Sequence, residues 1–324
     1  MRMKDVIIEA APMEGVTDYA FRSVQAKHFA CADKYFTPFI SPTATRKFSE
    51  KQLRELRPEN NAGICLVPQL IGHDAGDFLW ACGELKAMGY DEVNFNLGCP
   101  SGTVVSKKKG SGLLSEREML TRFFDEVFEN APVSVSVKTR IGRMDTEEFS
   151  ALLELFSAYP ISELIIHPRL QTQQYKGKPF LPAWEAALNE YKRPLCYNGD
   201  LFTAEKAESF IAAYPQTERI MLGRGLAADP AIVGELKNGV KAQKSEFKEF
   251  HDELLEVDHR RIGQDKPLLM HMKELWFYLA CSFENPEKPM KSIKKAQSLS
   301  DYRAAVEILF NSCEMRTDAG FHQA

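Results

Sequence analysis

Eight short apolar runs recur along the first 240 residues, and each is followed by a segment long enough for an amphipathic helix. Most of these runs are continuously apolar rather than alternating, which is typical of parallel strands buried on both faces. The expected strands are Ile7–Ala11, Tyr35–Phe39, Leu66–Ile71, Glu92–Leu97, Val133–Lys138, Leu164–His167, Leu195–Asn198 and Arg219–Leu222. Eight strand–helix units over about 235 residues match a TIM (β/α)8 barrel. A doubly wound α/β sheet is the alternative, although it usually has fewer strands.

Helical patterns fall between the expected strands. Ser115 and Glu118 have the spacing of a capping box, which predicts that a helix begins there. The apolar face of this helix comprises Met119, Phe123, Phe124, Val127 and Phe128. Further helices are expected to open at Asp145–Glu148, with Leu152, Leu153 and Phe156 on the apolar side, and to span Asp74–Met88 and Thr203–Ala213.

After Gly239 the β-branched runs stop and helical periods take over. One apolar stripe comprises Leu268, Leu269, Met272, Leu275, Trp276 and Leu279, and a second comprises Tyr302, Val306, Leu309 and Phe310. We therefore predict a barrel domain over residues 1–240 and a C-terminal all-α helical domain over 241–324, with Lys241–Glu246 as the linker.

The composition is that of a globular protein without a strong overall charge. The formal net charge is −4, so any contact with nucleic acid has to come from local basic patches. The seven cysteines include no C-x-x-C pair, which argues against a zinc site or an iron–sulfur cluster. Free thiols indicate a reducing compartment, and neither a signal peptide nor an apolar run of membrane-spanning length is visible. We expect a cytoplasmic protein without a metal ion.

Polar residues repeatedly follow the apolar runs. In a barrel of parallel strands the reactive groups lie at the carboxyl ends of the strands. Reading those ends in order gives Pro12-Met13-Glu14-Gly15, Gln69, Asn96-Leu97-Gly98-Cys99-Pro100, Lys138-Thr139-Arg140, His167-Pro168-Arg169, Asn198-Gly199-Asp200 and Gly223-Arg224-Gly225. Such a set can hold a planar, phosphorylated cofactor that forms hydrogen bonds.

The Gly223–Ala228 stretch matches a dinucleotide-binding pattern, G-x-G-x-x-A. That pattern normally opens the first βαβ unit, whereas here it follows the last strand. A phosphate held by backbone N–H groups at a helix start, with Arg224 adding a charged contact, fits this position better. A tight turn that simply needs glycine is the remaining interpretation.

Several linked motifs occur in a fixed order along the chain. They are Ala11–Asp18 with Phe21-Arg22 following, Asn96–Ser101 followed by Lys107–Leu114, Val137–Gly142, Tyr197–Asp200 and Met221–Gly225. In these motifs, and over essentially its whole length, the chain resembles the tRNA-dihydrouridine synthase family. It differs in Pro168, where the family usually has a small residue between the histidine and the arginine. Proline removes a backbone donor and biases His167 toward an extended conformation.

The resemblance implies an FMN-dependent oxidoreductase that reduces the C5–C6 double bond of specific uridines in tRNA, with NADPH or NADH as the electron source. It implies that Cys99 is the general acid. The cofactor-binding residues it implies are Pro12, Met13, Glu14, Gln69, Lys138, His167, Asn198, Gly199, Asp200, Gly223 and Arg224. The residues expected to contact tRNA are Asn96, Lys107, Lys108, Lys109, Arg140 and Arg169.

Reduction of a uracil ring needs a hydride, which side chains cannot supply, and a proton. Reduced flavin can deliver the hydride to C6 while an acid on the opposite face protonates C5. A thiol with an ordinary pKa near 8.5 keeps its proton at neutral pH, so Cys99 suits that role. Taken alone, Cys99 is better interpreted as a small buried hydrophobe, and only its place between Gly98 and Pro100 at a strand end favours the acid role. Lys138 has two alternatives, a buried structural lysine and a Schiff-base nucleophile of an aldolase, and His167 and His271 can each be structural histidines.

Three basic patches could contact RNA phosphates: Lys107–Lys109 at the barrel mouth, Lys288 with Lys291, Lys294 and Lys295, and Arg46 with Lys47. Charge runs are usually solvated faces, so the tRNA expectation rests on the resemblance. The target base would have to be flipped into the pocket. Two other functions stay open: a barrel acting on a free pyrimidine, similar to a dihydroorotate dehydrogenase, and a non-catalytic RNA-binding barrel. The helical tail opposes the first and Cys99 the second. We expect a monomer with no membrane partner.

Overall fold

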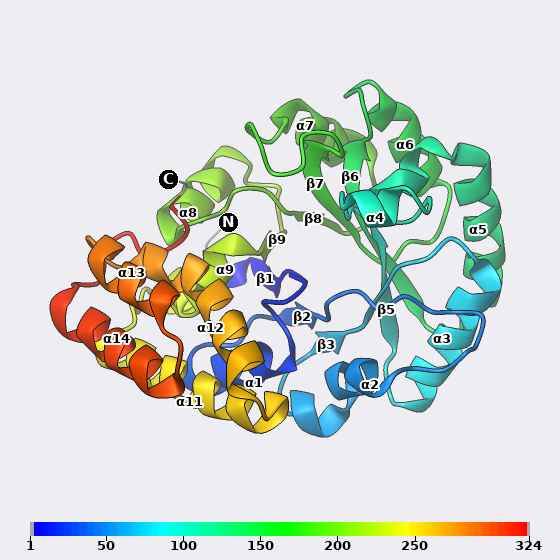
Figure 1. The fold of residues 1–324 in the computed structure, drawn as a ribbon. Coiled ribbons are helices and arrows are strands. Elements are labelled where there is room, and N and C mark those ends of the chain that lie inside the picture. The colour runs from blue at the N-terminus through cyan, green and yellow to red at the C-terminus, as the bar shows by residue number, and fades with distance from the viewer. Residues whose placement is uncertain (1–2, 323–324) are drawn as a thin grey trace.

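The computed structural model describes residues 3–322, and within them nine parallel strands curl into a barrel (Figure 1). The strand order is β3-β2-β1-β9-β8-β7-β6-β5-β4. The strands are β1 (Ile7–Ala10), β2 (Lys34–Phe36), β3 (Leu66–Val67), β4 (Gln69–Leu70), β5 (Glu92–Leu97), β6 (Ser134–Gly142), β7 (Leu164–Leu170), β8 (Leu195–Tyr197) and β9 (Arg219–Leu222). Because β3 and β4 are adjacent parts of one segment, the two edges of the sheet meet there and the barrel closes.

Pro68 divides the segment that we predicted as one strand, Leu66–Ile71. β3 pairs with β2 and β4 pairs with β5, so the chain changes its neighbour at this proline. Proline has no backbone donor, but the Pro68 carbonyl accepts a hydrogen bond from the Asn94 N–H at 2.8 Å. The prediction of eight strands is therefore wrong by one, while the (β/α)8 architecture and all eight segments are confirmed.

Helices surround the barrel. They are α1 (Tyr19–His28), α2 (Glu50–Leu56), α3 (Ala75–Ala87), α4 (Gly102–Val105), α5 (Arg117–Asn130), α6 (Glu148–Ser157), α7 (Leu181–Glu190), α8 (Ala204–Ala213), α9 (Arg224–Ala228) and α10 (Ile232–Asn238), with 3-10 helices η1 (Met3–Asp5), η2 (Pro58–Asn61) and η3 (Gly110–Ser115). The capping box predicted at Ser115 is wrong. Ser115 ends η3, where its hydroxyl donates to the Gly112 carbonyl at 3.3 Å, and α5 begins two residues later.

The chain beyond the barrel is helical, as predicted. It comprises α11 (Lys244–Ile262), α12 (Asp265–Leu279), η4 (Ala280–Ser282), α13 (Glu287–Lys295) and α14 (Leu299–Ser312). Both predicted apolar stripes are buried, and α11 begins three residues earlier than the predicted linker allows. α11 packs against α1 and α12 against α9, at one side of the barrel (Figure 1). One continuous set of buried apolar side chains includes both parts, so the boundary at residue 240 stays a prediction.

No helix within residues 3–322 has the length and apolar character needed to cross a membrane.

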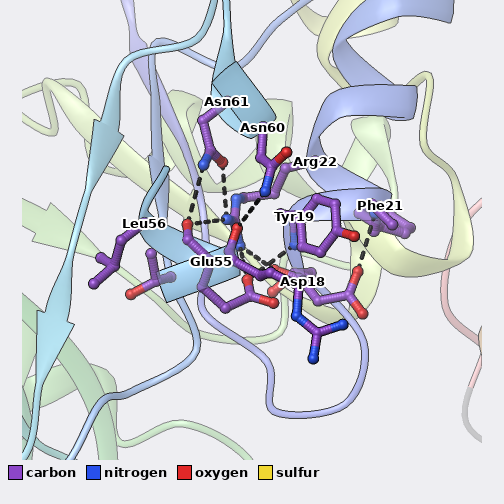
Figure 2. A network of polar contacts seen from close by, with 12 residues as sticks. Asp18, Tyr19, Phe21, Arg22, Glu55, Leu56, Asn60 and Asn61 are labelled. Atoms are coloured by element: carbon purple, nitrogen blue, oxygen red, sulfur yellow. Dashed lines mark hydrogen bonds and ion pairs between the residues drawn. The ribbon is translucent and has the colours of Figure 1, made fainter. Parts of the chain in front are cut away.

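Arg22, the arginine of the motif that begins at Ala11, forms hydrogen bonds inside the protein (Figure 2). Its side chain is fully buried, and its guanidinium donates to the Thr17 carbonyl at 2.8 Å and to the Glu55 carboxylate at 3.1 Å. It also donates to the Glu55 carbonyl at 3.1 Å and to the Asn61 side chain at 2.9 Å. The Glu55 carboxylate in turn accepts from the Tyr19 N–H at 2.9 Å. This network fixes α1 against α2 and η2.

Charged side chains fill the amino-terminal end of the barrel. Glu163 pairs there with Lys34 at 3.2 Å and with Arg219 at 3.1 Å. Glu9 is fully buried beside Glu163, and neither of its carboxylate oxygens has a hydrogen-bond partner in the described structure. Burial, followed by the negative charge of Glu163, raises the pKa of Glu9 well above its ordinary value.

We predict that Glu9→Gln stabilises the protein at neutral pH and leaves its stability unchanged near pH 4. Below the ordinary glutamate pKa, about 4.3, both folded and unfolded chains carry the proton. Above it the unfolded chain ionises while folded Glu9 stays protonated, which costs about 1.4 kcal/mol of folding free energy per pH unit. Urea unfolding at several pH values measures the difference. A glutamine variant that is less stable than the wild type at every pH would contradict this account of Glu9, and Glu163→Gln, which breaks two ion pairs, is the destabilising control.

Candidate active site

The predicted site residues meet at the carboxyl ends of the strands, where β5, β6 and β7 lie side by side. Asn96 is the register partner of Lys138, and Arg140 is that of His167. Across the mouth, the Asn198 amide donates to the Met221 carbonyl at 2.8 Å and joins the end of β8 to β9. The order of the strands thus brings together residues that are far apart in the sequence, such as Met13 and Gly223, which are 210 positions apart.

Cys99 lies in a turn that is braced on both sides. The Asn96 side-chain oxygen accepts from the N–H groups of Gly98 at 3.0 Å and Cys99 at 2.9 Å. The Cys99 carbonyl accepts from the Ser111 hydroxyl at 2.8 Å and from the Ser111 N–H at 3.1 Å. Gly110 has a φ of +54°, and a Cβ there would lie 2.9 Å from the Cys99 carbonyl, so the glycine lets the two segments approach.

The Cys99 side chain is half-buried, and burial raises the pKa of its thiol. The Ser101 backbone and the charge of Arg140 oppose that shift only in part. The thiol is therefore held in its protonated form at neutral pH, as a proton donor requires.

A chain of buried polar side chains joins the neighbouring strands β4, β5 and β6 at this turn. Asn96 donates to the Gln69 oxygen at 2.7 Å, Gln69 donates to the Asn94 oxygen at 2.7 Å, and Asn94 donates to the Ser136 hydroxyl at 3.0 Å. Because each amide both donates and accepts, the network fixes which atom each residue presents. Gln69 therefore orients Asn96, and Asn96 orients the Cys99 turn.

Arg140 supports the same turn from the other side. Its guanidinium donates to the carbonyl of Gly98 at 2.8 Å and to those of Leu170 at 2.9 Å and Gln174 at 2.7 Å. Burial lowers the pKa of Arg140 to about 10, which leaves the group charged at neutral pH. Arg140 is only 1% exposed, so its bonded guanidinium acts within the protein, and a direct tRNA contact stays a prediction.

Arg169, Asp200 and Arg224 form a charged triad beside His167. Arg169 donates to both oxygens of Asp200, at 2.8 and 2.5 Å, and Arg224 donates to one of them at 3.0 Å. Arg169 also lies 3.0 Å from His167 Nε2. Since a guanidinium only donates, Nε2 must accept, which leaves the His167 proton on Nδ1. Arg169 is buried like Arg140, and its predicted tRNA contact is likewise untested.

Positive charge is in excess around His167. Burial, then the charges of Arg140, Lys138, Arg169 and Arg224, lowers the pKa of His167 well below its ordinary value, so the imidazole is neutral. Lys138 is recessed in the mouth, and burial followed by the charge of Arg140 lowers its pKa to about 8. Within residues 3–322 the Lys138 ammonium has no recorded hydrogen bond or ion pair. This cluster of cations opposite a single carboxylate, Asp200, is suited to an anionic ligand.

The other predicted cofactor residues line the rim with different exposures. The loop at Pro12 and Met13 is held by Thr17, whose hydroxyl accepts from the Met13 N–H at 2.8 Å. A Cβ on Gly223 would lie 3.5 Å from the Met13 sulfur, and one on Gly199 would lie 2.8 Å from the Tyr197 hydroxyl. Glu14 is exposed and pairs with Lys51 at 3.7 Å, and its negative charge adds to the rise in the pKa of Cys99.

The three mouth lysines do not form one free patch. Lys108 pairs with Glu116 at 3.0 Å, and Lys109 donates to the Ser41 hydroxyl at 3.0 Å. Lys107 is exposed to solvent. α9, which follows Gly223, has five residues, so it offers a much weaker dipole than the helix start expected there.

Pro168 lies within β7 without the loss of a strand hydrogen bond. β7 continues through His167, Pro168 and Arg169, and the pairing with β6 shifts register at this point while β8 has already ended. The missing proline N–H therefore breaks no pairing, and the Pro168 carbonyl accepts from the Phe180 N–H at 2.6 Å.

Sequence reasoning missed several residues of the site: Asn94, Ser111, Ser136 and Tyr175. The first three support other residues. Ser111 lies within the Lys107–Leu114 motif, but nothing in the sequence marks Asn94 or Ser136. Tyr175 lies in the loop after β7, and its half-exposed ring lies 5.5 Å from the Arg140 guanidinium and 5.2 Å from that of Arg224. An aromatic residue two positions before Gly177, in a long loop, was the only available hint.

In the part of the chain that the structure describes, two groups of His, Cys, Asp and Glu are close enough to share a metal ion: Glu9, Glu163 and Cys196, and Asp18, Asp258 and His271. Cations of the protein already neutralise both. Lys34 and Arg219 pair with Glu163, and Arg261 pairs with Asp18 at 2.8 Å and with Asp258 at 2.5 Å.

Comparison with known proteins places this geometry in context. The model of the dihydrouridine synthase family matches residues 9–309. The chain is 26% identical to tRNA-dihydrouridine synthase B of Pasteurella multocida over 284 residues, which cover 85% of the chain and 84% of the relative. It is 26% identical to a probable tRNA-dihydrouridine synthase of Rhodobacter capsulatus, covering 91% of the chain and 93% of the relative.

Solved structures share the fold. The chain superposes on morphinone reductase in complex with tetrahydroNAD with a TM-score of 0.50 and 13% identity, covering 74% of the chain and 89% of that structure. It superposes on TcOYE with pHBA with a TM-score of 0.53 and 12% identity, covering 74% and 91%. At these identities the likeness confirms the barrel alone.

Proposed function

Since the chain belongs to the dihydrouridine synthase family, we propose that it reduces the C5–C6 double bond of specific uridines in tRNA, with FMN as the hydride carrier and Cys99 as the acid. The observation that carries the proposal is the position of Cys99, on a turn that Asn96 and Arg140 hold at the carboxyl ends of the strands, beside a barrel mouth with more cations than carboxylates. We further propose NADPH or NADH as the reductant, a monomeric state and a cytoplasmic location.

The residues present fit FMN. The recessed Lys138 ammonium has no hydrogen-bond or ion-pair partner among residues 3–322, and an electron-rich flavin carbonyl would satisfy it. Arg224 and Arg169 outnumber the one carboxylate between them, which leaves positive charge for a phosphate. Gly199 and Gly223 have no side chain to cover the backbone, and a Cβ at Gly199 would lie only 2.8 Å from the Tyr197 hydroxyl.

When bound and reduced, FMN supplies the hydride. The protein supplies the proton and the geometry. Asn96 and Ser111 hold the Cys99 turn, so the thiol stands at a fixed place at the mouth. Burial keeps that thiol protonated until C5 needs the proton, and Arg140 holds the Gly98 carbonyl so that the turn does not shift. Neutral His167 can donate from Nδ1 without adding charge beside the cations.

We predict that FMN binds more weakly as the pH rises above about 8, the pKa of Lys138 in the free protein. A flavin contact favours the charged ammonium, so Lys138 keeps its proton to higher pH in the complex than in the free protein. Between these two pKa values, the dissociation constant of FMN rises by up to about tenfold per pH unit. Quenching of FMN fluorescence measures this dependence. Lys138→Met should flatten it; a slope equal to that of the wild type would remove Lys138 from the cofactor site.

We predict that alanine at Lys107, Lys108 and Lys109 together weakens tRNA binding and lowers its salt dependence. Each phosphate contact contributes close to one unit to the slope of log affinity against log salt. Because Lys108 and Lys109 are already bonded within the protein, we expect the slope to fall by about one rather than three. Filter binding at several salt concentrations measures the slope, and the same substitution of Lys288, Lys291 and Lys294 tests the second patch. An unchanged slope would assign the loop another role.

The experiment that tests the substrate class compares turnover on unmodified tRNA with turnover on free uracil and on orotate. Reduction of tRNA with little turnover of either free pyrimidine supports the proposal. Efficient turnover of a free pyrimidine, without activity on tRNA, would favour the dihydroorotate dehydrogenase-like alternative.

A further inference from the structure

The C-terminal tail, residues 313–322, leaves the helical part and runs back to the barrel mouth. The Arg316 N–H donates to the Ser282 carbonyl at 2.9 Å, and the Gly320 N–H donates to the Ser282 hydroxyl at 3.1 Å. The Phe321 N–H then donates to the Phe202 carbonyl at 3.0 Å, beside an antiparallel bridge between Gly320 and Thr203. Backbone contacts therefore dock the tail on the β8–α8 connection.

Gly320 makes the close approach possible. Its φ is +141°, and a Cβ there would lie 2.1 Å from the Phe202 carbonyl oxygen and 2.9 Å from a Thr203 methyl carbon. A side chain at this position would push the tail away from the barrel. The docking thus depends on glycine twice, for the positive φ of the tail and for its close approach to Phe202.

Docking places an aromatic ring of the tail against Arg224. The Arg224 guanidinium lies 5.2 Å from the centroid of the buried Phe321 ring and 4.6 Å from that of Phe202. Tyr175 contributes a third ring at 5.2 Å, and Asp200 an ion pair at 3.0 Å. Phe321 also packs edge-on against Phe202, at 5.1 Å between centroids. The guanidinium is held among three rings, one of which comes from the end of the chain.

We propose that Phe321 is a positioning residue of the cofactor site: the C-terminal tail holds Arg224 ready for the phosphate of the flavin. This inference rests on the proposed function, which assigns Arg224 to that phosphate. A guanidinium with free rotamers loses entropy when it binds an anion, whereas one already fixed by aromatic rings loses less. The rings also favour the cation over its hydrated state without neutralising it, as a second carboxylate would.

The test uses Phe321→Leu, which keeps an apolar side chain but removes the ring, and compares binding of FMN with binding of riboflavin to the flavin-free protein. Riboflavin lacks the phosphate. We expect FMN to bind about fivefold to tenfold more weakly to the variant, a tenfold loss being about 1.4 kcal/mol, and riboflavin to bind as it does to the wild type. Phe310→Leu, a buried phenylalanine of α14 with no contact to Arg224, is the matched control for loss of a core ring.

A double-mutant cycle separates positioning from simple support of the fold. Arg224→Lys keeps the charge but not the planar group, so adding Phe321→Leu to it should cost little further FMN affinity. Equal losses for FMN and riboflavin, no loss for either, or losses that multiply with Arg224→Lys would each overturn the inference while leaving the proposed function intact. A wild-type protein that binds no FMN would overturn both.

Discussion

Replacement of Cys99 by alanine is expected to leave flavin binding intact and to lower the rate of tRNA reduction by a factor of about 10² to 10⁴, the range for loss of a positioned acid. Only the proton donor is removed, since the Cys99 turn is held through backbone groups that alanine keeps. Single-turnover oxidation of the bound reduced flavin by tRNA measures the effect.

Cys65→Ala, which removes an exposed thiol elsewhere in the barrel, is the matched control and should react as the wild type does. In the wild type the rate should not fall as the pH passes about 8.5, where an ordinary thiol ionises, because burial raises the pKa of Cys99. Undiminished activity of the alanine variant would remove Cys99 from the proton transfer.

Replacement of Arg22 by methionine is expected to lower the free energy of unfolding by about 3 to 5 kcal/mol, the usual cost of leaving one partner of a buried ion pair alone. Glu55 would lose its cation, and the Thr17 carbonyl and the Asn61 side chain would lose a donor (Figure 2). Urea unfolding measures the change. Arg57→Met is the control, because Arg57 pairs with Glu50 at the surface and should contribute less than about 1 kcal/mol. Equal effects of the two substitutions would contradict the structural role of Arg22.

The architecture of the chain could be predicted because buried parallel strands leave a local signal, the continuous apolar run. The strands at Glu92–Leu97 and Arg219–Leu222 are confirmed at both ends. The errors lie where a distant partner decides the local structure. From the sequence, Pro68 lies inside one continuous apolar run. Only the pairing of β3 with β2 and of β4 with β5 shows that the strand divides there. Ser115 has the spacing of a helix cap, but its hydroxyl donates to the Gly112 carbonyl instead.

The family and its oxidoreductase chemistry could be predicted for a different reason, since the linked motifs are specific and the family match confirms the resemblance. Which motif residues face a ligand could not be read in the same way. Arg22, Arg140 and Arg169 look alike in the sequence, yet all three are buried and bonded to the protein. Their partners, such as Asn61 and Gln174, lie in loops that carry no pattern of their own.

The most direct test of the account loads the purified protein with FMN, reduces it without oxygen and mixes it with unmodified tRNA in a single turnover. We predict that each flavin oxidised yields one dihydrouridine in the tRNA, measured by nucleoside mass spectrometry after digestion. A folded protein that takes up no FMN, or one whose reduced flavin persists in the presence of tRNA without forming dihydrouridine, would contradict it.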